Sequence, residues 1–176
     1  LGRRQRQMCI RDRYTIYMKS RKIIAGVDEV GRGSLIGSVY SAAVILPDHG
    51  SKLRLKDSKK LTRKSRIELA NSVIKESICI SIGIATKDEI DSINIHHATL
   101  LSMRRAVYNL SIKPNLVLVD GLYEPKIEID CESIVKGDNK VEQISAASII
   151  AKVARDSEMV FLHDKFKMYN FKKNNG

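Results

Sequence analysis

An apolar segment that runs directly into two acids constrains the fold of this chain more than any other feature. Residues 24–27 favour a β-strand, and Asp28 and Glu29 follow without an intervening turn. Two neighbouring charges at this point would be costly to bury unless a cation or hydrogen bonds compensated them. The segment therefore predicts a strand that ends either in a metal-binding pair of carboxylates or in a solvated acidic turn.

A divalent cation would suit these acids, because Mg²⁺ prefers hard oxygen ligands and is usually held by one or two carboxylates with phosphate and water. Adjacent residues of a regular strand point to opposite faces of the sheet, so Asp28 and Glu29 cannot both aim straight into one site. Either the strand loses its regularity there, or one of the two acids acts through its backbone carbonyl or through a water molecule.

Glycines flank the arginine that follows the acids. Gly31 and Gly33 would permit positive φ and close approach of the backbone, so amide groups and the Arg32 guanidinium could together grip a sugar-phosphate. The segment is not a dinucleotide-binding fingerprint, because its third glycine, Gly37, falls one position late and its acids precede the loop. These features favour metal-assisted phosphodiester chemistry.

Asp120 stands at the end of a second apolar run. Residues 116–119 form a continuous apolar stretch that predicts a buried strand, and Asp120 and Gly121 follow it. Ligand sites in open α/β sheets lie at the carboxyl ends of strands. Asp120 is therefore a second candidate for the same edge of a sheet.

Asp138 has weaker local support. Because it lies between Gly137 and Asn139, the segment could be an ordinary turn. Asp130 and Glu132 are near alternatives, although their alternation with apolar residues favours a solvated strand face.

Six motifs occur in an order that resembles a known family. After residues 28–33 (DEVGRG) come the segments 57–61 (DSKKL), 94–107 (NIHHATLLSMRRAV), 118–121 (LVDG), 136–138 (KGD) and 144–156 (ISAASIIAKVARD). Each motif alone is weak, but together they resemble ribonuclease HII, the type 2 ribonuclease H, from about residue 22 to about residue 171.

The resemblance implies specific roles for nine residues. Four acids would be catalytic and would also bind metal: Asp28, Glu29, Asp120 and Asp138. The Gly-Arg-Gly that recognises the 2′-hydroxyl of a ribonucleotide at its junction with DNA would be Gly31, Arg32 and Gly33. Lys59 and Lys60 would lie near the nucleic-acid backbone.

The resemblance also implies an α/β protein of the ribonuclease H-like fold, with a mixed central sheet flanked by helices. It implies hydrolysis on the 5′ side of ribonucleotides, in RNA/DNA hybrids or embedded in duplex DNA, for ribonucleotide removal, DNA repair and replication. Two divalent ions, Mg²⁺ or Mn²⁺, would serve the reaction. We expect a cytoplasmic monomer whose partner is the nucleic acid and not a membrane.

Two other interpretations stay open. The sister enzyme ribonuclease HIII shares the acids, but it carries an extra N-terminal domain that residues 1–22 are too few to supply. A nucleic-acid-binding fragment without catalysis is the alternative from another class. Four acids facing a phosphate favour the enzyme, since pure binding has no use for them.

Local patterns predict the elements of the fold. We expect strands at about 22–29, 38–46, 78–85, 116–120 and 127–134, and helices at about 62–75, 95–110 and 141–162, with Thr62 as an N-cap. Early strands in succession, followed by strands that alternate with helices, predict a mixed sheet. Ser145 and Ser148 are expected to be small packing residues of the last helix.

Charge is unevenly distributed. The chain carries a net +11, but residues 1–22 hold eight of its 31 basic residues and one of its 20 acids, which leaves 23 − 19 = +4. We expect residues 1–17 to be a non-native or disordered extension, and a basic arm that binds nucleic acid is the alternative. Residues 18–176 would form the catalytic domain without its C-terminal end, because the family pattern continues beyond Gly176 into a tyrosine.

A basic cluster precedes and enters the first predicted helix. With one acid among them, its members fall within fifteen positions: Lys52, Arg54, Lys56, Lys59, Lys60, Arg63, Lys64 and Arg66. Such a surface would neutralise phosphates and release counterions, although a solvated helix face is the alternative. Arg104 and Arg105 could extend it or could form the exposed side of their own helix.

Several classes of protein are excluded. The sequence has no apolar run of about 18 residues, as a membrane-spanning helix requires, and no secretory signal follows its basic start. Three scattered cysteines and four histidines lack metal-ligand spacing. The cysteine pattern is consistent with a reducing cytoplasm.

Overall fold

The structure, a computed structural model, describes residues 22–47, 53, 55 and 62–171. Its elements are β1 (Ile24–Val30), β2 (Val39–Ile45), α2 (Arg63–Glu76), β3 (Cys79–Ala85), α3 (Lys87–Tyr108), β4 (Leu116–Asp120), β5 (Asp130–Ile134), η2 (Gly137–Asn139), α4 (Glu142–Lys165) and η3 (Lys167–Tyr169). The predictions for residues 1–17, for Lys59 and Lys60, and for Lys52, Arg54 and Lys56 of the basic cluster concern residues outside the described ones.

In the described part of the chain, five strands form one sheet in the order β3-β2-β1-β4-β5. β1 pairs with β2, and β2 with β3, in antiparallel orientation. β1 also pairs with β4, and β4 with β5, in parallel orientation. The predicted mixed sheet is confirmed, and the carboxyl ends of β1 and β4 meet at the same edge.

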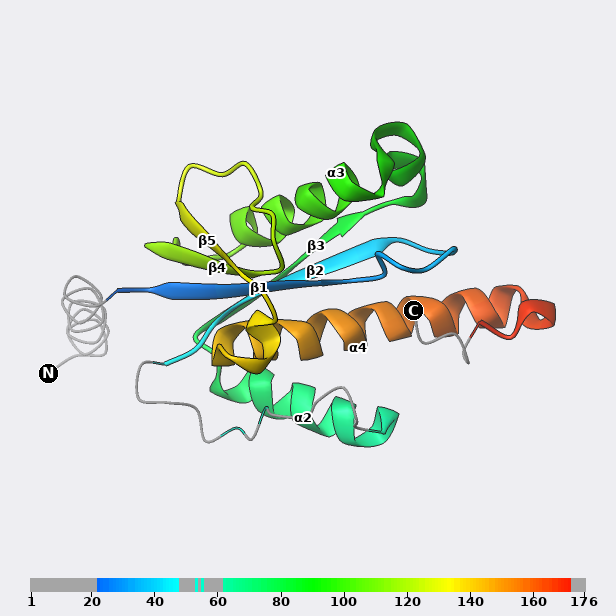
Figure 1. Ribbon diagram of the computed structural model, residues 1–176. Coiled ribbons are helices and arrows are strands. Elements are labelled where there is room, and N and C mark those ends of the chain that lie inside the picture. Colours follow the sequence, from blue (N-terminus) through cyan, green and yellow to red (C-terminus); the bar gives the residue numbers. More distant parts are fainter. Residues whose placement is uncertain (1–21, 48–52, 54, 56–61, 172–176) are drawn as a thin grey trace, which may run out of the picture.

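Helices cover both faces of the sheet (Figure 1). α3 covers one face, where its buried residues pack on a cluster that includes Val27, Val117 and Val119. α4 covers the other face, and α2 packs beside it over a cluster that includes Val44 and Ala147. β1 is therefore buried on both sides, and the predicted sheet flanked by helices is confirmed.

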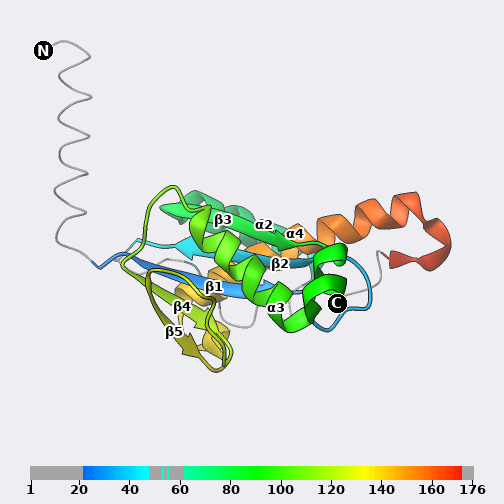
Figure 2. The same cartoon turned by 90° about the horizontal axis from the view of Figure 1, so that it is seen from above.

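α4 lies very close to β1. A Cβ at Gly26 would collide with the backbone of Gln143 and Ile144. The predicted close packing of this helix is confirmed: Ile144, Ala147 and other small or branched residues of its inner face are buried. Towards its other end the helix extends past the sheet, as Figure 2 shows, and Phe161 is exposed there.

Most predicted boundaries agree with the structure. β4 has the predicted bounds, and Thr62 caps α2, since its Oγ1 accepts a hydrogen bond from the Ser65 N–H at 3.2 Å. β5 is shorter than predicted, beginning at Asp130. Among the described residues, no helix combines the length and the apolar character that crossing a membrane would need.

The prediction of α3 was incomplete. The helix begins at Lys87, where Thr86 and Glu89 form a capping box, and it is interrupted at Asn94, which has φ 66°. The Asn94 Oδ1 accepts hydrogen bonds from the N–H groups of His96 and His97. The predicted start near residue 95 is thus the start of the second helical segment.

Candidate active site

Asp28 and Asp120 are brought together by the parallel pairing of β1 with β4. The pairing ends at Val27 and Val119, and each acid is the next residue of its strand. Both acids therefore lie at the carboxyl edge of the sheet, on the face covered by α4. Asp28 is only 5% exposed.

The Asp28 carboxylate is fixed by two hydrogen bonds. Its Oδ1 accepts from the Glu29 N–H at 2.8 Å, and the Ser148 side chain on α4 hydrogen-bonds to it. Burial, the Glu29 carboxylate and, more weakly, Asp120 raise the pKa of Asp28 well above its usual range, against the opposing effect of Ser148. The charged form is thus disfavoured until a cation compensates it.

Glu29 belongs to the same electrostatic cluster. Burial first, and then the Asp120 carboxylate, raise the pKa of Glu29, while Arg32 lowers it. β1 keeps its antiparallel pairing with β2 at both acids. The pairing with β2 is therefore regular here, which favours the second of the two geometric alternatives, in which one acid acts through its backbone carbonyl or through water.

Asp138 reaches the site through the turn that precedes α4. The Asp120 Oδ1 accepts a hydrogen bond from the Gly137 N–H at 2.6 Å, so Asp138 is the neighbour of a residue bonded to Asp120. Lys136 has a left-handed backbone with φ 57°. A Cβ at Gly137 would lie 2.6 Å from the Ile144 side chain. The turn expected here is present, and the hydrogen bond from Gly137 to Asp120 attaches it to the sheet edge that carries the acids.

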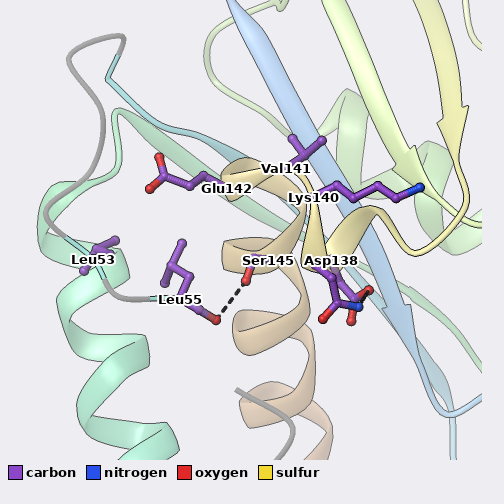
Figure 3. A pocket seen from close by; sticks show the side chains of 8 residues that line it. Leu53, Leu55, Asp138, Lys140, Val141, Glu142 and Ser145 are labelled. Carbon is purple, nitrogen blue, oxygen red and sulfur yellow. Dashed lines mark hydrogen bonds between the residues drawn. The ribbon is translucent and has the colours of Figure 1, made fainter. Parts of the chain in front are cut away.

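A pocket of about 440 Å³ opens beside Asp138. Figure 3 shows Asp138 across the pocket from Leu53 and Leu55, with Ser145 between them on α4. The Ser145 Oγ–H donates to the Leu55 carbonyl oxygen at 3.1 Å and so anchors that segment to the helix. Apolar and polar side chains both line this pocket, which is next to one of the four candidate acids.

The two serines of α4 are more than the packing residues that the sequence suggested. Ser145 bonds the backbone of Leu55, and Ser148 bonds Asp28. They are three positions apart and share the helix face that covers the sheet edge. The spacing of three residues indicated a shared helix face, but the sequence did not identify Leu55 and Asp28 as the partners of the two serines.

The Gly-Arg-Gly segment forms an exposed loop after β1. Gly31 has φ +102°, and a Cβ there would lie 2.9 Å from the Ser38 carbonyl oxygen, so the predicted positive φ is confirmed at this glycine. Gly33 does not have positive φ, and a Cβ there would meet no atom within 4 Å. Arg32 is exposed. Within the part of the chain that the structure describes, no neighbouring atom requires glycine at position 33.

The basic residues that can be placed do not form one free surface. Arg66 pairs with Asp156 at 3.0 Å, with both side chains only 15% exposed. Arg105 donates to both carboxylate oxygens of Glu89, at 2.8 and 2.6 Å. Both guanidiniums are thus held by carboxylates of the protein, and binding of phosphate by these two arginines stays a prediction.

The acids of β5 lie apart from this cluster. Asp130 and Glu132 are exposed, and they alternate with half-buried residues along the strand. The predicted solvated face is therefore confirmed.

The donor set fits a hard divalent cation, although in residues 22–47, 53, 55 and 62–171 no three His, Cys, Asp or Glu side chains are already arranged to hold a metal ion. Asp28 and Asp120 each have one carboxylate oxygen bonded to a backbone amide. The clustered oxygens and the raised pKa values of Asp28 and Glu29 are nevertheless the conditions that a cation would relieve.

Solved structures define the class of the fold. The crystal structure of the ribonuclease H2 from Pyrococcus horikoshii has a TM-score of 0.74 and 32% identity, covering 81% of this chain and 76% of that one. The Mn²⁺ complex of Bst-RNase HIII has a TM-score of 0.71 at 19% identity, covering 82% of this chain and 55% of that one, and shows the fold alone. The fold is thus that of the ribonuclease H-like hydrolases.

Sequence relatives give the family. Residues 25–176 match the family Ribonuclease HII. The ribonuclease HII of Alteromonas mediterranea is 51% identical over 155 residues, which are 88% of this chain and 82% of that protein. The chain belongs to the ribonuclease HII family, whose members are metal-dependent endoribonucleases. This assignment decides against the ribonuclease HIII alternative.

Proposed function

We propose that this chain hydrolyses the phosphodiester on the 5′ side of a ribonucleotide, in an RNA/DNA hybrid or embedded in duplex DNA. The products would be 3′-hydroxyl and 5′-phosphate ends. One observation supports this most strongly: Asp28, Glu29 and Asp120 repel one another at a buried sheet edge, directly before an exposed loop that offers Arg32.

Asp28, Glu29, Asp120 and Asp138 are the residues that would hold two Mg²⁺ or Mn²⁺ ions. When bound, such ions supply an activated water and stabilise the leaving 3′-oxygen of an in-line displacement. The contribution of the protein is to orient its carboxylates before the substrate arrives. Amides fix one oxygen each of Asp28 and Asp120, and Ser148 is a further partner of Asp28, so the carboxylates are already oriented.

Recognition of the ribose is assigned to Gly31, Arg32 and Gly33. The open space around Gly33 would let the backbone approach a sugar closely, and the exposed Arg32 guanidinium could donate to a phosphate. The 2′-hydroxyl distinguishes RNA from DNA at such a site. Lys59 and Lys60 would contact the nucleic-acid backbone nearby.

The cellular part of the proposal is ribonucleotide removal during DNA repair and replication, by a cytoplasmic monomer. The catalytic unit would be residues 18–176, and residues 1–17 would not contribute. The match of residues 25–176 to the ribonuclease HII family supports the placement of the catalytic unit after residue 17.

Cleavage of a DNA duplex that contains one ribonucleotide tests the proposal. With Mg²⁺ we expect cuts on the 5′ side of the ribonucleotide, and Asp120→Asn should lower kcat by roughly 1,000-fold or more, since it removes a carboxylate from the site. Asp130→Asn, an exposed acid of the same sheet, is the matched control and should cut normally. Binding without cutting in Mg²⁺ or Mn²⁺ would instead support the non-catalytic alternative.

A further inference from the structure

The loop between β1 and β2 is fastened to α4 by two charged side chains. The Arg155 Nη2–H donates to the Ile36 carbonyl oxygen at 3.0 Å. The Glu158 carboxylate accepts from the Ser38 N–H at 3.1 Å and from the Ser38 Oγ–H at 2.8 Å. These contacts join residues about one fifth of the way along the chain to residues near its end, and the site described above does not use them.

Arg155 is unusual because it is fully buried. Its exposed fraction is 0%, and its Nε and Nη1 have no hydrogen-bond partner in the part of the chain that the structure describes. Burying a guanidinium with unfilled donors is unfavourable, and an apolar side chain of similar length would fill the space without that penalty. Stability alone therefore does not account for an arginine here.

The guanidinium lies directly beneath the loop. A Cβ at Gly31 would stand 2.6 Å from the Arg155 Nε, and one at Gly37 would stand 2.9 Å from the Glu158 Oε2. Both glycines have positive φ. Arg155 therefore lies against Gly31, and Glu158 lies against Gly37, so each meets the loop at a residue without a side chain. The two glycines bracket the segment that presents Arg32. We call Arg155 and Glu158 together the clamp.

We propose that Arg155 and Glu158 are positioning residues for ribose recognition, which they support by holding the loop in the conformation that presents Arg32 and Gly33. This inference rests on the proposed function of the Gly-Arg-Gly segment. Neither residue touches the substrate in this proposal. Their effect reaches the substrate through Ile36 and Ser38, so it should appear in substrate binding and not in the chemical step.

The test compares steady-state kinetics of full-length variants on a duplex with one ribonucleotide. Arg155→Met and Arg155→Lys should raise KM by about tenfold for Met and less for Lys, with kcat within about threefold of the wild type. Glu158→Gln, which keeps the shape but loses one acceptor, should raise KM about threefold. Ser157→Ala, on the exposed side of the same turn, should change neither constant.

A double variant shows whether the clamp acts through the loop. Arg32→Ala should itself raise KM, and adding Arg155→Met should raise it little further, because both changes remove the same recognition. Full additivity would overturn the inference, as would a fall in kcat at constant KM. If thermal unfolding shows that neither Arg155 variant folds, Glu158→Gln decides: an unchanged KM in the folded variant overturns the inference.

Failure of this inference is distinguishable from failure of the proposed function. If Arg32→Ala leaves KM unchanged, the loop does not recognise the substrate, so the recognition role of the loop and this inference both fail, while loss of cutting in Asp120→Asn tests the hydrolysis separately. If Arg32→Ala raises KM while folded Arg155 and Glu158 variants behave like the wild type, only the clamp is overturned.

Discussion

The acidic edge and the Gly-Arg-Gly loop are built in different ways. At the edge, Asp28 and Asp120 end two paired strands, amides of Glu29 and Gly137 donate to them, and Ser148 of α4 is a further partner of Asp28. The loop has a local turn, in which the Ser34 N–H donates to the Gly31 carbonyl oxygen, and it is also held by side chains of a helix more than 100 residues away in sequence. The acids are thus positioned first by the pairing of their strands, whereas the loop depends on a local turn and on tertiary contacts.

The largest expected effect concerns the edge. Asp28→Asn should lower kcat by roughly 1,000-fold or more, because it removes a carboxylate from the metal-binding set. The same change should leave the metal-free protein equally stable or more stable, since it relieves repulsion with Glu29 and Asp120. Cleavage assays and thermal unfolding without divalent ions measure the two effects. A large loss of stability would mean that the carboxylate is structural.

The two glycines of the loop should behave differently. Gly31→Ala places a Cβ against Arg155 and Ser38 at positive φ, so it should destabilise the protein by about 1–3 kcal/mol. Gly33→Ala meets no protein atom, so it should leave stability unchanged and weaken substrate binding alone. Thermal unfolding and KM separate these outcomes. Equal loss of stability in both variants would contradict the difference.

A smaller effect is expected at the junction of α2 with α4. Arg66→Ala should reduce the free energy of unfolding by about 1 kcal/mol, because Arg66 pairs with a largely buried Asp156 that also contacts Lys152 at 3.2 Å. KM should be unaffected. The exposed Lys64→Ala on the same helix is the control and should not change stability. If Arg66→Ala instead raises KM in a salt-dependent way, Arg66 contributes to phosphate binding.

The smallest effect is a pH dependence at the start of α3. The Arg105 guanidinium, followed by the Thr86 backbone, lowers the pKa of Glu89 to about 2 from its usual 4.5. A depressed carboxyl pKa stabilises the fold above the unfolded value, and this contribution disappears as the pH falls from 4.5 towards 2. The Tm difference between wild type and Glu89→Gln should therefore shrink across that window. A difference independent of pH would contradict the ion pair.

The sequence predicted the edge better than the loop for a physical reason. The bounds of β4 follow from an apolar run that stops at Asp120, and the acids are visible where such runs end. The missed first segment of α3 had a local signal, the capping box of Thr86 and Glu89. Partners such as Ser148 for Asp28 depend on how α4 lies across the sheet, and no local pattern encodes that.

Among the nine proposed site residues, the structure brings Asp28, Glu29 and Asp120 to one edge, places Asp138 on the turn that Gly137 bonds to Asp120, and places the Gly-Arg-Gly loop after β1. The ion pairs of Arg66 and Arg105 show what a count of charges in the sequence leaves out. A basic side chain in the sequence has no visible partner, so a cluster of them resembles a free surface. Whether each is free depends on acids such as Asp156, which lies 90 positions from Arg66.

The central position of β1 has a consequence for the growing chain. β1, β2 and β3 are neighbours in the sheet and close in sequence, whereas the partner of β1 on its other side, β4, is translated only after α3. The turn with Asp138 and the helix that supplies Ser148 come later still. A nascent polypeptide therefore contains Asp28 and Glu29 long before the segments that carry Asp120, Asp138 and Ser148 have been made, so these side chains can meet only late in translation.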